Sequence, residues 1–213
     1  MTSKLNLTLE DRKILQHVEE FGFITINETQ NMFYNTQGHG YEIARRHLSK
    51  IVVSGKLSVF KEPYCNKNVY YMKDKPSYHS ILLMDYYSLL VRSGAFIRFF
   101  ERKQPWMGKK YNSDAFCMYT LGDNVFFDII EVVRTKGVDT NKYKEIYESK
   151  DAHKICDGLY KLLEESNGSE RPDEFPRLVV IDDIEHNNRL SIPDDITIIQ
   201  LDYNLSEFSR LFV

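Results

Sequence analysis

The chain has 213 residues, of which 42% are hydrophobic and 28% charged, and its formal net charge is -3 at pH 7. These values are typical of a folded soluble protein and exclude a disordered, collagen-like or coiled-coil chain. The length favours two small domains, since domains most often have about 100 to 150 residues.

No stretch approaches the roughly 18 to 20 apolar residues of a membrane span, so we expect a cytoplasmic protein without a membrane partner. The three cysteines, Cys65, Cys117 and Cys156, are far apart and form no C-x-x-C pair. They predict neither a disulfide framework nor a thiolate zinc site.

Charge is unevenly distributed along the chain. Residues 1–39 carry 3 Lys/Arg and 5 Asp/Glu, and residues 40–75 carry 8 and 3. Residues 92–112 carry 6 Lys/Arg and 1 Asp/Glu, whereas residues 113–213 carry 11 Lys/Arg and 21 Asp/Glu. Two basic blocks therefore precede an acidic half, and basic blocks of this kind are typical of nucleic-acid-binding proteins.

Two helices are predicted near the N-terminus by their capping residues. Thr8 with Asp11 resembles a capping box, and apolar residues at helical spacing follow until Gly22 ends the run. Thr25 with Glu28 repeats the signal and predicts a second, short helix. The connection between these helices is short.

A third helix is predicted from about Gly40 to Val53, followed by strands at Leu57–Lys61 and Asn68–Met72. Three helices and a hairpin in this order are typical of a winged helix. We therefore predict a winged-helix DNA-binding domain over residues 1–75.

In such a domain the third helix enters the major groove and the hairpin reaches the adjacent backbone or minor groove. The residues predicted to contact double-stranded DNA are Arg45, Arg46, Ser49 and Lys50 on the helix, and Lys61, Asn66 and Lys67 on the hairpin. One alternative is that these side chains are ordinary solvated groups on the protein surface and bind nothing. Another is that the domain binds protein, as some winged helices do.

The second half, residues 76–213, predicts an α+β domain. The expected elements are a helix at 78–93, strands at 96–102, 113–120 and 125–133, a helical stretch at 141–165, a linker at 166–176, and strands at 177–181 and 196–201. The order is αβββαβ with one further strand.

Two acids in this order resemble the PD-(D/E)XK nuclease core, the restriction-endonuclease-like fold. Asp114 begins the second strand and Glu131 lies in the third. The resemblance implies that these carboxylates hold a divalent metal such as magnesium, with a lysine two residues after the glutamate. Val133 occupies that lysine position, so we expect a non-catalytic core, unless Lys142 or Lys144 of the next helix supplies the lysine.

A structural role for Glu131 is the alternative. A carboxylate in so apolar a strand needs a partner, which Arg98, Arg102 or Lys142 would supply. Asp128 lies on the opposite face of the strand by parity, so it should not share a metal with Glu131.

The pairing of these two modules resembles the replication-relaxation family of plasmids and other mobile elements. The matching stretches are LTLEDRKILQHVEEFGFIT, SDAFCMY and VFFDIIEVV. The resemblance implies a DNA-binding accessory role in replication, conjugative transfer or transcription control. If the core is inactive, its sheet would suit dimerisation or the docking of a partner such as a relaxase or replication protein. We expect a homodimer, because two-fold symmetry suits a winged helix that reads a palindromic site.

Two further hypotheses belong to different classes. One is a metal-dependent endonuclease that uses Asp114 and Glu131, and the other is a protein-interaction adaptor that does not bind DNA. A basic loop around Trp106, with Lys103, Lys109 and Lys110, is either an additional phosphate-binding surface or an ordinary loop anchored by the tryptophan. No other catalytic or cofactor motif is present.

Overall fold

A computed structural model describes residues 6–134, 138–167, 176–182 and 196–212, with the backbone alone for residues 163–167. The chain divides into two compact units, Met1–Ser93 and Gly94–Val213. The boundary lies later than the expected one between residues 75 and 76. No helix in the described part of the chain is long and apolar enough to cross a membrane.

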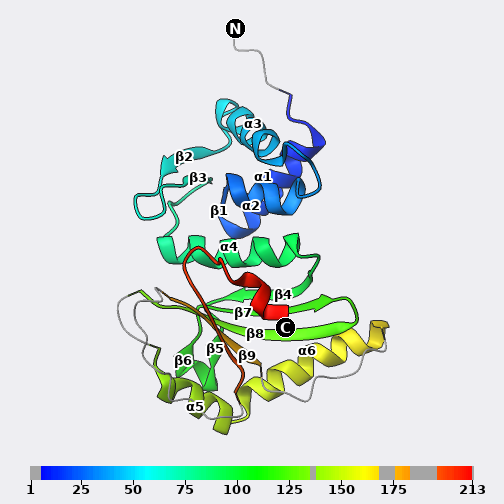
Figure 1. Cartoon of the computed structure of the whole chain (residues 1–213), viewed down its shortest axis with the longest axis vertical. Coiled ribbons are helices and arrows are strands. Elements are labelled where there is room, and N and C mark those ends of the chain that lie inside the picture. Colours follow the sequence, from blue (N-terminus) through cyan, green and yellow to red (C-terminus); the bar gives the residue numbers. More distant parts are fainter. Residues whose placement is uncertain (1–5, 135–137, 168–175, 183–195, 213) are drawn as a thin grey trace. The chain divides into compact units, whose positions relative to one another are not determined.

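The first unit contains four helices and a small sheet (Figure 1). In chain order they are α1 (Leu9–Phe21), β1 (Phe23–Thr25), α2 (Ile26–Phe33), α3 (Gly40–Val53), β2 (Ser58–Lys61), β3 (Asn68–Tyr71) and α4 (Tyr78–Arg92). The predicted three helices and hairpin are confirmed. Strand β1, which pairs antiparallel with β3, was not predicted, because its three buried residues show no alternation.

Both predicted capping boxes are present in the first unit. The Thr8 backbone N–H donates to Asp11 at 2.7 Å, and the Thr25 backbone N–H donates to Glu28 at 2.6 Å. Gly22 ends α1 with φ 92°, a left-handed conformation that costs glycine little. The capping boxes fix where α1 and α2 begin, and Gly22 fixes where α1 ends, before any packing is considered.

Helix α3 packs its apolar face into the core of the first unit. Ala44, Leu48 and Ile51 are fully buried there with Ile14 and Ile24. The opposite face of α3 is left to solvent, as the 3.6-residue period requires.

The helix predicted to begin the second module packs against α2 of the first unit. Asn31 of α2 donates to the hydroxyl of Ser88 at 3.1 Å, and Lys67 donates to Asp85 at 2.6 Å. The ring of Tyr87 lies 5.3 Å from that of Phe21. These contacts explain why α4 belongs to the first unit.

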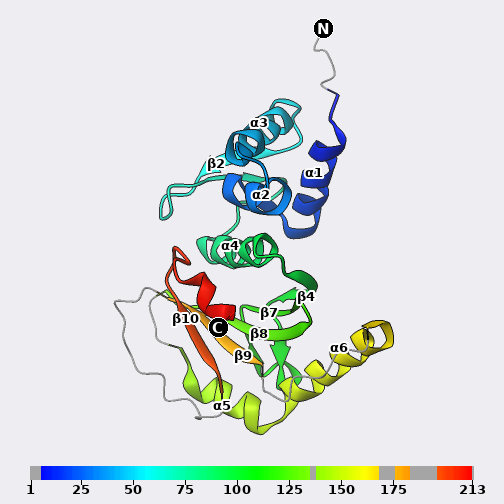
Figure 2. The same cartoon turned by 45° about the vertical axis from the view of Figure 1, so that its right-hand side comes forward.

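The second unit is built on a mixed five-stranded sheet in the order β10-β9-β8-β7-β4 (Figure 2). Its elements are β4 (Phe96–Arg102), β5 (Pro105–Trp106), η1 (Met107–Lys109), β6 (Tyr111–Asn112), β7 (Ala115–Leu121), β8 (Asn124–Val132), α5 (Thr140–Glu148), α6 (Asp151–Asn167), β9 (Arg177–Ile181), β10 (Ile198–Leu201) and η2 (Phe208–Phe212). The antiparallel meander β4-β7-β8 was predicted and is confirmed. Strands β9 and β10 continue the sheet in parallel with β8.

Three details differ from the prediction. The helical stretch is divided into α5 and α6 around Lys150, whose φ is 57°. The short hairpin β5–β6 and the turn η2 were not predicted. Most of the expected linker, residues 168–175, lies outside the described residues.

Helices α5 and α6 cover one face of the sheet (Figure 1). Tyr143, Ile146 and Tyr160 pack there against buried strand residues such as Phe116 and Ile129. The other face carries a buried polar network instead of a purely apolar one, which is described with the candidate site.

Replacement of His17 is predicted to change how stability depends on pH. Burial beside Phe21 and Phe33 lowers the pKa of His17 to about 4. Between this value and the ordinary value of 6.5 the unfolded chain binds more protons than the folded protein. The unfolding free energy should therefore fall as the pH is lowered through this window, and His17→Phe should remove that contribution.

Urea unfolding of the wild type and His17→Phe at several pH values across the window would measure the difference. The exposed His39 provides a control, since His39→Phe should keep the wild-type slope. Equal slopes for wild type and His17→Phe would show that His17 is not held neutral by the fold.

Candidate functional site

The exposed face of α3 carries three of the predicted DNA-contacting residues. Arg45, Arg46 and Ser49 are all exposed. Arg45 pairs with Glu42 at 2.8 Å, one turn earlier on the same helix, and both side chains remain largely in solvent. An ion pair this exposed contributes little to stability and leaves the guanidinium available to a stronger partner.

Lys50, the fourth predicted residue on α3, has a structural partner. Its ammonium lies 2.6 Å from Asp11, and the same buried carboxylate lies 2.7 Å from Nδ1 of His47. Although burial acts to raise it, the hydrogen bonds from Lys50 and His47 lower the pKa of Asp11 to about 2. Lys50 thus ties α3 to α1.

The predicted hairpin residues also divide into two groups. Lys61 and Asn66 are exposed, and Asn66 has a left-handed φ of 57°. Lys67 is partly buried and its ammonium lies 2.6 Å from Asp85 of α4. Burial raises the pKa of Asp85, and Lys67 partly offsets that effect.

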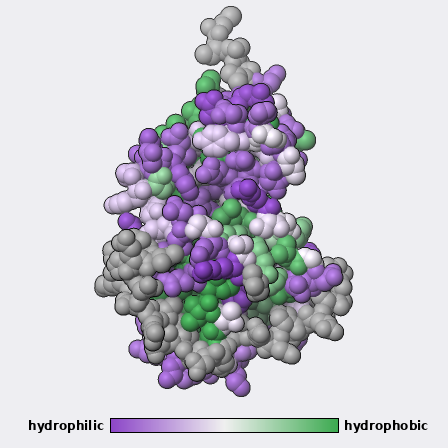
Figure 3. Space-filling view, viewed as in Figure 1, coloured by the Kyte–Doolittle hydropathy of each residue, from purple (hydrophilic) through white to green (hydrophobic). Residues whose placement is uncertain are grey.

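The surface seen in Figure 3 is mainly hydrophilic over the helices of the first unit. Five of the seven predicted DNA contacts are exposed and remain available for binding: Arg45, Arg46, Ser49, Lys61 and Asn66. Lys50 and Lys67 already neutralise buried carboxylates within the fold.

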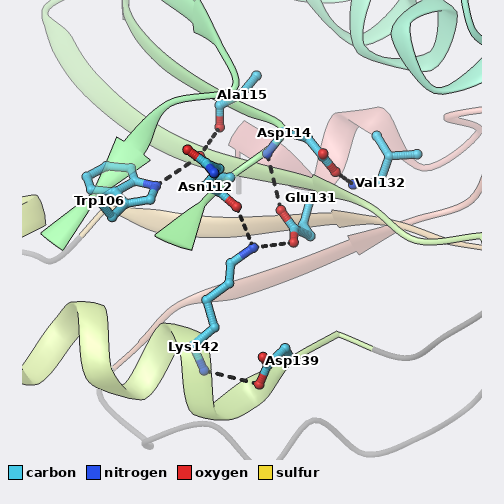
Figure 4. A network of polar contacts seen from close by, with 9 residues as sticks. Trp106, Asn112, Asp114, Ala115, Glu131, Val132, Asp139 and Lys142 are labelled. Atoms are coloured by element: carbon cyan, nitrogen blue, oxygen red, sulfur yellow. Dashed lines mark hydrogen bonds and ion pairs between the residues drawn. The ribbon is translucent and has the colours of Figure 1, made fainter. Parts of the chain in front are cut away.

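A second candidate site lies where β7 and β8 meet, and it brings together Asp114 and Glu131 (Figure 4). The Asp114 backbone N–H donates to Oε2 of Glu131 at 3.2 Å. In return the Val132 backbone N–H donates to Oδ2 of Asp114 at 2.8 Å. Each carboxylate thus accepts a hydrogen bond from a backbone N–H of the neighbouring segment.

Lys142 of α5 completes this cluster. Its ammonium donates to Oε1 of Glu131 and, at 2.9 Å, to the carbonyl of Asn112 (Figure 4). The helix is positioned by Asp139, whose carboxylate accepts from the Lys142 backbone N–H at 3.2 Å. Lys142 and Glu131 are both largely buried, with side chains 9% and 16% exposed.

Opposing influences act on the pKa of Glu131, and burial is the largest of them. Burial raises the pKa of Glu131, and the ammonium of Lys142 acts in the opposite direction. A carboxylate and an ammonium in contact at a nearly buried position form an ion pair, and removal of either one leaves the other as an unpaired buried charge.

Position 133 cannot serve as the lysine of the motif. Val133 is 7% exposed and belongs to the apolar core between the sheet and the helices. Of the two substitutes considered, Lys142 reaches Glu131, whereas Lys144 is exposed and lies 3.9 Å from Glu148. Of the three predicted partners for Glu131, Lys142 is the one found in contact, while Arg98 lies over the ring of Phe96.

Asp128 lies on the other face of the sheet and has a different partner, as parity predicted. Arg177 of β9 donates to both of its carboxylate oxygens, at 2.8 and 3.0 Å. The same guanidinium reaches the hydroxyl of Tyr119 and the carbonyl of Leu211, both at 2.6 Å. This network joins three strands to η2 and is separate from the Glu131 cluster.

Sequence reasoning missed the support that β5 and β6 give to the cluster. Trp106 is fully buried and donates from Nε1 to the hydroxyl of Ser113 at 3.0 Å. Ser113 in turn donates to the Ala115 carbonyl at 3.1 Å, which holds the chain on both sides of Asp114. A single tryptophan beside proline, methionine and glycine signals a buried anchor but not which residues it supports.

The residues present suit a divalent ion that keeps several bound waters better than one that is coordinated entirely by protein side chains. In the described part of the chain no three His, Cys, Asp or Glu side chains are grouped to hold a metal. Magnesium is commonly bound by one or two carboxylates and keeps several waters. Asp114 and Glu131 provide such a pair, although Lys142 competes with a metal for Glu131.

Comparisons with models of known families, with curated proteins and with solved structures found no match to this chain. The resemblance to the replication-relaxation family therefore remains a prediction from the sequence.

Removal of Lys142 should destabilise the protein. Lys142→Ala leaves the carboxylate of Glu131 buried without its cation, and we expect the unfolding free energy near neutral pH to fall by about 3 kcal/mol. Chemical denaturation would measure the change. The loss should shrink at acidic pH, because a protonated Glu131 no longer needs the ammonium.

The control is Lys144→Ala on the same helix, since the side chain of Lys144 is 58% exposed. It should alter stability by less than about 0.5 kcal/mol. Equal effects of the two substitutions would contradict a structural ion pair between Lys142 and Glu131.

Proposed function

We propose that this protein binds duplex DNA through a winged helix in its first unit. The observation that carries the proposal is the free polar face of α3, where Arg45, Arg46 and Ser49 are exposed while the opposite face is locked in the core. Arginine and serine on such a helix recognise phosphates and base edges.

The hairpin β2–β3 supports the same proposal. Lys61 and Asn66 are exposed on it, and its far end is held to α4 by Lys67 and Asp85. A hairpin that is held in place and carries exposed polar residues suits contact with the DNA backbone next to the groove that α3 would enter.

For the second unit we propose a nuclease-like fold that serves self-association or docking of a replication or transfer protein. The protein would then act as an accessory or regulatory factor of a plasmid, phage or integrative element. This proposal rests on the order of its strands and on the resemblance to the replication-relaxation family. A homodimer would match the symmetry of a palindromic DNA site.

Substitution of the α3 arginines tests DNA binding. Arg45→Ala with Arg46→Ala should weaken binding of a short duplex and lower the slope of log affinity against log salt by about 0.9 for each phosphate that is no longer neutralised. Fluorescence anisotropy over a series of salt concentrations would measure both quantities.

The matched control is Arg12→Ala with Lys13→Ala, which removes two exposed charges from α1. It should leave the salt slope close to that of the wild type. If both double variants behave alike, α3 is not the recognition helix. If the wild type binds no duplex even at low salt, a protein-interaction adaptor is the better description.

A second candidate function, a metal-dependent endonuclease, is favoured by the position of Lys142. Asp114 and Glu131 would hold a divalent ion, and Lys142 lies beside Glu131 as the lysine of the nuclease motif would. The ion, when bound, would polarise a phosphodiester and lower the pKa of an attacking water. The contribution of the chain is to hold the two carboxylates adjacent and to keep an ammonium next to them.

Incubation with supercoiled plasmid distinguishes the endonuclease from the non-catalytic accessory protein. An endonuclease should produce nicked plasmid with magnesium but not with chelator, and Asp114→Ala should abolish nicking by removing one of the two metal-binding carboxylates. Asp123→Ala, which removes an exposed acid from the β7–β8 turn, is the control and should nick like the wild type. Intact plasmid in every magnesium reaction would favour the non-catalytic protein.

A further inference from the structure

The hairpin β5–β6 is an extension of strands β4 and β7. The Lys103 backbone N–H donates to the carbonyl of Asp114 at 2.8 Å, and the Ser113 backbone N–H donates to the carbonyl of Gln104 at 3.0 Å. Beyond these pairs, Pro105 lies opposite Asn112. The hairpin therefore begins at the Asp114–Glu131–Lys142 cluster and projects from it.

The hairpin is firmly anchored. Trp106 is fully buried and meets the ring of Phe116 edge-on, with 5.4 Å between the ring centroids. At the tip, the Met107 backbone N–H donates to Oδ2 of Asp151 at 2.6 Å. Lys110 pairs with Glu145 of α5, so the tip is attached to both helices of the unit.

The tip is also strained. Met107, Gly108 and Lys109 have φ values of 49°, 64° and 76°, so three consecutive residues are left-handed. This conformation costs on the order of 1–3 kcal/mol at each non-glycine residue, and strain of this kind is concentrated at functional sites. Lys109 in this tip is exposed, whereas Trp106, three residues earlier, is fully buried.

The charge of the hairpin differs from that of the rest of the second unit. Residues 94–112 carry five Lys/Arg and one Asp/Glu, whereas residues 113–213 carry 11 and 21. Lys103 and Lys109 are exposed, and neither forms an ion pair with any described residue. Two cations without partners on a rigid support in an otherwise acidic unit suit a polyanion.

We propose that the hairpin is a second DNA-contacting element, in which Lys103 and Lys109 bind the phosphate backbone of duplex DNA beside the Asp114–Glu131–Lys142 cluster. The inference rests on the proposed DNA binding and extends it to the second unit. A rigid pair of phosphate contacts adds affinity without adding sequence preference.

The test compares the full-length protein with Lys103→Ala/Lys109→Ala. Removal of two phosphate contacts should lower the magnitude of the salt slope by about 1.8, and should weaken binding of a short duplex about tenfold at low salt. The same weakening is expected for duplexes of unrelated sequence, since the contacts are to the backbone. The control, Lys154→Ala/Lys161→Ala, removes two exposed charges from α6 and should bind like the wild type.

The outcomes separate this inference from the proposed function. If the wild type binds duplex and the hairpin variant shows the same affinity and slope, the hairpin does not touch DNA, although the winged-helix proposal stands. An equal weakening in the α6 control would show that only total charge matters and would also overturn the inference. If the wild type does not bind duplex at all, both proposals fail.

Discussion

A buried carboxylate must be neutralised or hydrogen-bonded, and this constraint organises both units of the protein. Asp11 is neutralised by Lys50 and hydrogen-bonded to His47, and Asp85 is neutralised by Lys67. In the second unit Asp128 is paired with Arg177 and Glu131 with Lys142. Each pair joins two different elements of its unit, and removal of one partner would leave an unpaired charge in a poorly solvated environment.

The same constraint decides which basic residues are available for binding. Lys50 and Lys67 appear in the sequence as two more charges of a basic block, yet the fold uses both to neutralise carboxylates. Arg46, Lys61, Lys103 and Lys109 are exposed and have no such role. The polyanion-binding surface that we propose is therefore smaller than the basic blocks suggest, and it is divided between α3, the hairpin β2–β3 and the hairpin β5–β6.

Lys142 shows how a cation for a strand carboxylate can come from a neighbouring helix. Val133 belongs to the apolar core, and a lysine there would be buried without a partner. Lys142 lies in the first turn of α5, and from there its ammonium reaches the carboxylate of Glu131 on β8. The arrangement forms an ion pair, and the endonuclease that we propose as a second candidate function would use the same three side chains.

Local patterns in the sequence were sufficient to predict the capping boxes, the lengths of α1 to α3 and the β4-β7-β8 meander, since each depends on residues close together in the chain. Strand parity was sufficient to predict that Asp128 and Glu131 lie on opposite faces of the sheet. Tertiary structure alone decided the pairing of β1 with β3, the place of α4 in the first unit and the choice of Lys142 over Lys144. The first two features depend on contacts between residues far apart in the sequence. The third depends on how α5 packs on the sheet through Tyr143 and Ile146, which turns Lys142 toward Glu131. No local period encodes either. The role of Trp106 was decided in the same way, because an aromatic residue in a polar loop signals burial but not the surface on which it packs.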